Sequence, residues 1–109
     1  MNLKEYQNFA LSTAVYPDIG KNWHYPLIGL VGEIGELANK LKKSIRDDND
    51  KITDKKREEC IDELGDLQWY FVILCYELHI DPEFVLLNNI SKLRNRKEKG
   101  TIHDTGGER

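Results

Sequence analysis

Cysteine, proline and methionine are scarce in this 109-residue sequence, which contains two, three and one of them, respectively. Cys60 and Cys75 fall in one predicted helix, where their separation is about 22 Å at 1.5 Å per residue, which excludes a disulfide between them within one chain. The N-terminal segment also lacks the apolar stretch of a secretion signal. These absences predict buried thiols and a cytoplasmic location.

Long apolar runs are missing as well. The longest one, residues 67–78, is interrupted by Gln68 and Glu77, and it is shorter than the roughly 20 residues that span a bilayer as a helix. No repeat, low-complexity segment or alternating strand pattern occurs, whereas apolar residues recur at helical spacing. The sequence therefore predicts a single all-α domain that does not enter a membrane.

Four helices account for this domain, with expected ranges of 2–15, 26–46, 54–79 and 82–99. Asp81, Pro82 and Glu83 form a typical helix start, and Gly100 stands where the last helix should end. We expect residues 1–100 to form one four-helix bundle-like protomer. Residues 101–109, which are rich in glycine and polar side chains, are expected to form a flexible tail.

The second half of the third predicted helix, from Leu67 to Tyr76, is apolar on every side. A helix of this kind has to be surrounded by other protein. A chain with 32% charged residues builds only a modest core of its own. We therefore expect a homodimer or homotetramer in which a second subunit completes the core.

Charge is distributed unevenly along the chain. Residues 1–91 carry a net charge of -6 and residues 92–109 a net charge of +3, which gives -3 overall. The overall negative charge argues against a generic nucleic-acid-binding protein. The acidic body and the basic end are the features that need a functional explanation.

Two acidic pairs dominate the body: Glu33-x-x-Glu36 on the second predicted helix and Glu63-x-x-Asp66 on the third. Residues three apart share one face of a helix, so an antiparallel pair of helices can bring four carboxylates together. A hard divalent cation such as Mg²⁺ would relieve their repulsion and would suit metal-assisted hydrolysis of a phosphate compound. The alternative is a solvated acidic face, which is the common role of a single pair.

Four glycines accompany the acidic pairs, at positions Gly29, Gly32, Gly35 and Gly65. Each costs about 1 kcal/mol relative to alanine inside a helix. Their presence suggests that a helix or a ligand approaches the backbone closely beside the acids.

Candidate substrate contacts lie at both ends of the chain. Asn89, Lys92 and Arg96 fall on one side of the fourth predicted helix and suit a polyphosphate, although cations near a helix end also complement its dipole. Trp23 follows a loop and could stack on a base, or it could be a structural anchor. Tyr6 is expected in the core.

The acidic motifs resemble those of the MazG-like nucleoside triphosphate pyrophosphohydrolases, an all-α superfamily. The resemblance includes Gly-Leu-x-x-Glu-x-Gly-Glu-Leu around Glu33, Asp-Glu-Leu-Gly-Asp-Leu-x-Trp-Tyr around Glu63, and the segment from Asn89 to Gly100. It covers essentially the whole chain, and it does not specify a substrate. No E-x-x-H motif is present, which argues against a ferritin-like di-iron bundle.

The resemblance implies hydrolysis of a nucleoside or deoxynucleoside triphosphate to the monophosphate and pyrophosphate, in nucleotide-pool cleaning. Glu33, Glu36, Glu63 and Asp66 would be the catalytic and metal-binding residues, with Mg²⁺ as the ion and Mn²⁺ as a substitute. Glu59 could help to orient water, although a solvated charge is the simpler interpretation. The alternatives are a non-catalytic helical protein that binds a metal–nucleotide complex and an oligomeric interaction protein.

Overall fold

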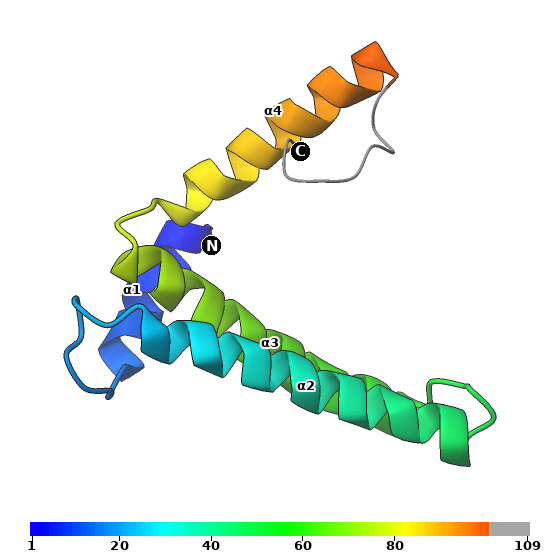
Figure 1. Cartoon of the computed structure of the whole chain (residues 1–109). Helices are drawn as coiled ribbons and strands as arrows, with labels where there is room; N and C mark the ends of the chain where they lie inside the picture. Colours follow the sequence, from blue (N-terminus) through cyan, green and yellow to red (C-terminus); the bar gives the residue numbers. More distant parts are fainter. Residues whose placement is uncertain (101–109) are drawn as a thin grey trace.

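The structure, a computed structural model, describes residues 1–100. Those residues form four helices and no strand: α1 (Leu3–Thr13), α2 (His24–Asp47), α3 (Asp54–Glu77) and α4 (Pro82–Lys99) (Figure 1). The predicted all-α class with four helices is confirmed. None of the described helices is long and apolar enough to cross a membrane. The tail predicted at 101–109 lies outside the described residues.

Local sequence signals account for most helix boundaries. Thr53 caps α3 by accepting a hydrogen bond from the Lys56 N–H. Asp81 caps α4 by accepting one from the Glu83 N–H, and Gly100 ends α4 in the left-handed conformation. The predicted bounds of α4 are therefore confirmed at both ends.

The other helices differ from their predicted ranges by one or two residues. Helix α2 begins two residues early, at His24, and has no side-chain cap. Helix α1 ends two residues early because Ala14 is extended. Helix α3 also ends two residues early, and His79 beyond it has a φ of 59°, a left-handed value that cannot continue a helix.

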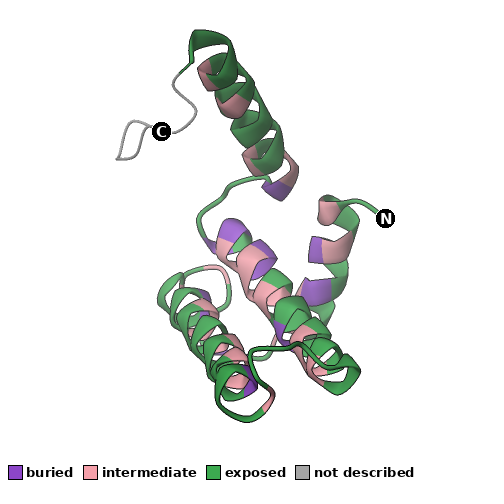
Figure 2. Cartoon of the chain, turned by 90° about the vertical axis from the view of Figure 1, so that its right-hand side faces the viewer, coloured by how far each residue is buried: buried purple, intermediate pink, exposed green. Residues whose placement is uncertain are grey.

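Helices α2 and α3 lie side by side as a long antiparallel pair, and α1 packs against α3 (Figure 1). The buried core lies where α1 meets the second half of α3, and it includes Ala10, Val72 and Ile73 (Figure 2). Tyr6 packs against this core, as predicted. Cys75 is buried, Cys60 is half-buried, and both are free thiols.

Helix α4 stands apart from the α2–α3 pair. Its main contacts are with α1, and most of its residues are exposed (Figure 2). The radius of gyration is 16.9 Å, compared with roughly 13 Å for a compact chain of this length. The single protomer is consequently an open four-helix arrangement, because α4 does not close over the other helices.

The loop between α1 and α2 is anchored by one buried carboxylate. Glu77 accepts hydrogen bonds from the Tyr16 hydroxyl at 2.5 Å and from the Gly20 and Asn22 backbone N–H groups at 2.7 Å each. The Tyr16 ring also stacks on Tyr25, with centroids 4.8 Å apart. Glu77 therefore fixes the entry into α2, a role that the sequence analysis missed.

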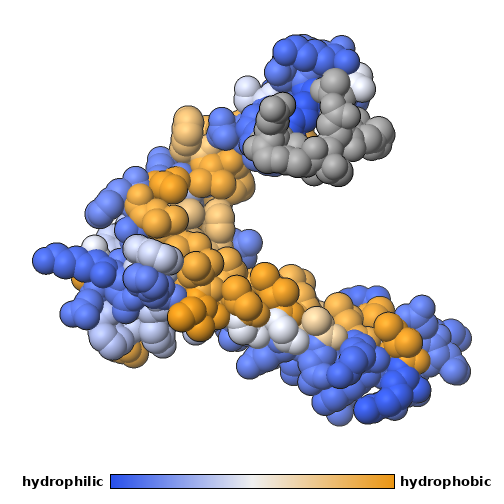
Figure 3. Space-filling model, viewed as in Figure 1, coloured by the Kyte–Doolittle hydropathy of each residue, from blue (hydrophilic) through white to orange (hydrophobic). Residues whose placement is uncertain are grey.

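Large apolar side chains remain exposed on all four helices. The sequence suggested that residues 67–76 of α3 would need a second subunit to cover them. They are instead largely covered by their own chain, and the exposed apolar residues lie mainly elsewhere. Figure 3 shows apolar surface around the base of α4 and along the α2–α3 pair. The helical residues of this kind that are at least half exposed are Phe9 on α1, Ile28, Val31, Ile34 and Ile45 on α2, Ile61 and Leu64 on α3, and Phe84 and Leu87 on α4.

Candidate metal centre

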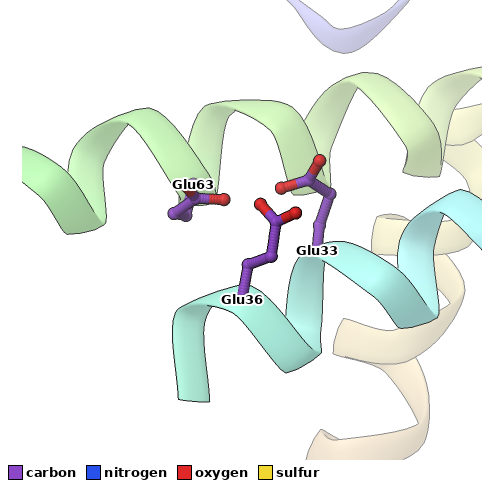
Figure 4. Close-up of side chains that lie close together, drawn as sticks. All are labelled: Glu33, Glu36 and Glu63. Atoms are coloured by element: carbon purple, nitrogen blue, oxygen red, sulfur yellow. The ribbon is translucent and has the colours of Figure 1, made fainter. Parts of the chain in front are cut away.

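Three carboxylates converge between α2 and α3. Glu33 and Glu36 reach across from α2, and Glu63 reaches from α3 (Figure 4). One oxygen of each lies within 4.8 Å of the others. We refer to these three residues as the acidic triad. The antiparallel pairing of α2 and α3 produces it, with three of the four carboxylates that the sequence predicted to converge.

The side that α2 turns toward α3 is mixed rather than purely apolar. Three half-buried leucines lie on it, Leu30, Leu37 and Leu41, together with Glu33 and the buried Ser44. Other apolar residues of α2, including Val31 and Ile34, are exposed. Part of the apolar stripe of α2 therefore faces outward, beside the side that carries the acidic triad.

Two oxygens of the triad are buried without a hydrogen-bond partner, namely Oε2 of Glu33 and Oε2 of Glu63. Glu63 as a whole is only 8% exposed. Burying an unpaired carboxylate is costly, so such oxygens need a proton or a cation. These two oxygens therefore have no cationic side chain of the described residues to neutralise them.

The ionisation of the triad reflects this shortage of positive charge. The pKa of Glu33 is raised to about 7, first because protonated Glu33 can donate a hydrogen bond to Glu63, then because of burial and the negative charge of Glu36 and Asp66. The pKa of Glu63 is lowered by that same hydrogen bond, against the effect of burial. Of Glu33 and Glu63, Glu33 is accordingly the one that holds a proton more readily.

A chain of ion pairs adjoins the triad on one side. Lys40 Nζ lies 3.6 Å from Glu63 Oε1 and 3.9 Å from Glu59 Oε2, and Lys56 Nζ lies 3.4 Å from that same Glu59 oxygen. Glu59 is thus paired with two lysines, so it is more than the isolated solvated charge that the sequence favoured. Lys40 itself was missed, although it follows Glu36 by four residues, a spacing that puts both on one side of α2.

On the other side of the triad is an open pocket of about 330 Å³, lined by Glu33, Asp66, Trp69 and Tyr70. Asp66 is not among the three carboxylates that converge within 4.8 Å. It faces the same pocket, and its charge contributes to the raised pKa of Glu33. Both aromatic residues, which fall in the apolar half of α3, line this pocket and are half-buried, and Trp69 also packs against the core.

The four glycines beside the acids have different surroundings. A Cβ on Gly29 would lie 2.1 Å from Cε1 of Tyr70. The Tyr70 ring therefore approaches the α2 backbone closely, as the sequence analysis anticipated for these glycines. A Cβ on Gly32, Gly35 or Gly65 would have nothing within 4 Å, so no close approach explains them within the described residues.

The predicted substrate contacts lie away from the triad. Asn89 and Lys92 are exposed on α4, and Arg96 is half-buried there, on the helix that packs mainly against α1. Trp23 stacks on His24 with ring centroids 3.7 Å apart and is 43% exposed. None of these four residues lines the pocket beside the triad.

The residues present fit a hard divalent cation. Such ions take carboxylate oxygens as ligands, and the triad offers three of them, two with buried and unpaired oxygens. The fold and this site define an all-α protein with a carboxylate centre between two antiparallel helices.

Comparison with known proteins assigns the family. The chain belongs to the MazG nucleotide pyrophosphohydrolase family, because the model of the MazG nucleotide pyrophosphohydrolase domain matches residues 26–101. The chain is also similar to the Gene 37 protein of Mycobacterium phage L5, with 40% identity over 114 residues and a match that covers 100% of both. No solved structure matches the chain.

Proposed function

We propose that this protein hydrolyses nucleoside or deoxynucleoside triphosphates to the monophosphate and pyrophosphate in a Mg²⁺-dependent reaction that removes unwanted nucleotides. The acidic triad with its unpaired buried oxygens supports this proposal most directly, and membership of the MazG family supports it independently. Mn²⁺ is expected to substitute, because it also prefers oxygen ligands. A cytoplasmic location remains a prediction.

Different residues of the chain would bind the metal ion, orient the water and contact the nucleoside. Glu33, Glu36 and Glu63 would hold the ion, which when bound would polarise a phosphate oxygen and lower the pKa of water. Asp66, at the rim of the pocket, is the candidate for completing the ligand set or orienting water. The adjoining rings of Trp69 and Tyr70 offer an aromatic surface for the nucleoside.

The activity test compares a catalytic variant with a matched control. Purified protein is incubated with a panel of ribonucleoside and deoxynucleoside triphosphates and Mg²⁺, and the release of pyrophosphate and monophosphate is measured. Glu36→Gln should lower kcat/KM by about 100-fold or more, equivalent to about 2.7 kcal/mol, because it replaces an ionised ligand with a neutral one. Asp62→Asn, which neutralises an exposed acid next to Glu63, should retain activity.

Two results would contradict the proposal. One is the absence of metal-dependent turnover on every nucleotide tested, and the other is full turnover by Glu36→Gln. Tight binding of a metal–nucleotide complex by calorimetry without product formation would instead support the non-catalytic binding protein.

We also propose that the functional unit is a homodimer or homotetramer. Helix α4 stands apart from the triad of its own chain, so Asn89, Lys92 and Arg96 are candidates to contact the phosphates bound by a second copy. The exposed apolar residues of α2 and α4 offer surface for such an assembly.

A further inference from the structure

The acidic triad poses a charge problem for any triphosphate. The triad and Asp66 carry four negative charges when ionised, and one divalent ion neutralises two of them. A triphosphate is itself strongly anionic, so it needs a cation from the protein to approach this site. Such a cation has to come from a basic side chain close to the triad.

Lys40 is the basic side chain that is ion-paired with the triad. Its Nζ is 3.6 Å from Glu63 Oε1, whereas Glu63 Oε2 is the buried oxygen without a partner. Lys40 thus occupies one oxygen of Glu63 and leaves the other for a cation. It comes from the α2–α3 pair itself, unlike the basic residues of α4.

Lys40 is held loosely enough to move. Its distances of 3.6 and 3.9 Å to Glu63 and Glu59 are long for hydrogen bonds, so charge attraction supplies much of what holds the ammonium. The side chain is also 31% exposed. With Glu63 bound to a divalent ion, Lys40 would lose much of its attraction to that carboxylate and its ammonium could pair with an incoming anion.

The order of residues along the two helices gives the site a direction. Gly29, Glu33 and Lys40 follow one another along α2, and their antiparallel partners on α3 are Tyr70, Glu63 and Glu59 in turn. The aromatic pocket consequently lies at one end, the triad in the middle and Lys40 at the other end. Glu33 and Lys40 are about 10 Å apart along the helix axis, at 1.5 Å per residue.

We infer that Lys40 binds the phosphates farthest from the nucleoside, an inference that rests on the proposed function of the triad. The nucleoside lies at the Tyr70 end and the terminal phosphates at the Lys40 end. Glu59, which is itself paired with Lys56, is the positioning residue that keeps the Lys40 side chain beside the triad.

The test uses inorganic tripolyphosphate, which has the phosphates of the substrate and no nucleoside. Calorimetry measures the affinity of the full-length protein for Mn²⁺ alone and then for tripolyphosphate at saturating Mn²⁺. The variants are Lys40→Met and Lys40→Arg, with Lys42→Met as the matched control, because Lys42 is exposed and lies two residues, or about 200°, around α2 from Lys40. Thermal melting confirms that each variant is folded.

Lys40→Met should weaken tripolyphosphate binding by about tenfold or more, equivalent to about 1.4 kcal/mol, without weakening Mn²⁺ binding. Lys40→Arg should retain most of the affinity, and Lys42→Met should match the wild type. For a nucleotide that is turned over, Lys40→Met should raise KM more than it lowers kcat. Equal weakening of Mn²⁺ and tripolyphosphate binding would show a purely structural Lys40 and overturn the inference.

The inference and the proposed function can fail separately. Tripolyphosphate binding that is unchanged by Lys40→Met, or absent in the wild type, overturns the inference even if nucleotides are hydrolysed. Tripolyphosphate binding that depends on Lys40, in a protein that hydrolyses no nucleotide, upholds the inference and refutes the proposed activity.

Discussion

Two buried glutamates of α3 show how hydrogen bonding separates a structural carboxylate from a functional one. Glu77 is 5% exposed and accepts three hydrogen bonds from the chain. Glu63 is 8% exposed and has an oxygen without any partner. Because buried polar atoms are nearly always satisfied, the three hydrogen bonds to Glu77 account for its burial, whereas the burial of Glu63 is explained by the cation that we propose for the triad.

The pH dependence of stability should reveal the anchor. Burial raises the pKa of Glu77, but the hydrogen bonds from Tyr16, Gly20 and Asn22 outweigh it and lower the pKa below its ordinary value. Its contribution is therefore fully present above the unfolded pKa, near 4.5, and is lost as the pH falls through the folded value. Glu77→Gln should cost about 1–3 kcal/mol at pH 7.

Urea denaturation of the wild type and Glu77→Gln at several pH values checks this prediction. The stability difference between the two proteins should shrink as the medium is acidified below pH 4.5. A difference that is constant with pH would mean that the charge of Glu77 has no part in anchoring the loop.

Removing one acid of the triad should stabilise the metal-free protein and should also abolish its stabilisation by Mg²⁺. Glu33→Gln removes one of the crowded negative charges, so the metal-free protein should be more stable than the wild type at pH 8, by about 1 kcal/mol. Millimolar Mg²⁺ should raise the melting temperature of the wild type by mass action and have little effect on the variant. Equal shifts in both proteins would place the ion elsewhere.

At the scale of the element, α2 has two faces with different purposes. The side toward α3 combines half-buried leucines with Glu33, Lys40 and Ser44, and part of the apolar stripe, including Val31 and Ile34, is exposed in the single chain. Each charged or hydroxyl-bearing residue on that side gains less from packing than an apolar one would.

The glycines of α2 should differ in their tolerance of alanine. Gly29→Ala gains helix propensity of about 1 kcal/mol, but its Cβ would clash with the Tyr70 ring, and such overpacking costs about 1–3 kcal/mol. Gly32→Ala meets open space and should keep the propensity gain. Chemical denaturation should rank Gly32→Ala above the wild type and Gly29→Ala below it, and the reverse order would contradict the close approach of Tyr70.

At the scale of the whole molecule, the single chain is more open than its length requires. Its radius of gyration of 16.9 Å and the apolar residues on the surface of α2 and α4 are typical of a protomer whose partner covers it. We therefore expect a second copy to contact these two helices rather than the end of α3. The reason is that α1 and α2 already cover most of that end.

Association should therefore be measurable and should depend on α2. Sedimentation velocity at micromolar concentration should show a dimer or tetramer of the wild type. Val31→Glu puts a charge at a position that is 63% exposed in the single chain and should shift the protein toward monomer. Asn39→Glu, which puts the same charge at a polar exposed position of α2, should have no such effect. A stable wild-type monomer would contradict the prediction.

The sequence by itself determined the helices, most of their boundaries and the carriers of the chemistry. Caps such as Asp81, breakers such as Gly100 and the three-residue spacing of Glu33 and Glu36 act within one or two turns of helix, so they can be read without knowing the rest of the fold. The convergence of Glu63 with them followed from one further assumption, that the two helices pair antiparallel.

The tertiary structure decided what depends on the rotation and placement of whole helices. The rotation of α2 about its axis brought Lys40 to Glu63 and left Ile34 exposed. Helical spacing alone shows which residues share a side of α2, but not which side faces α3. The direction of α4 kept Lys92 away from the acids of its own chain. The rotation and direction of a helix are set by the summed free energy of many contacts between residues that are far apart in the sequence. A local pattern of residues does not reveal these contacts.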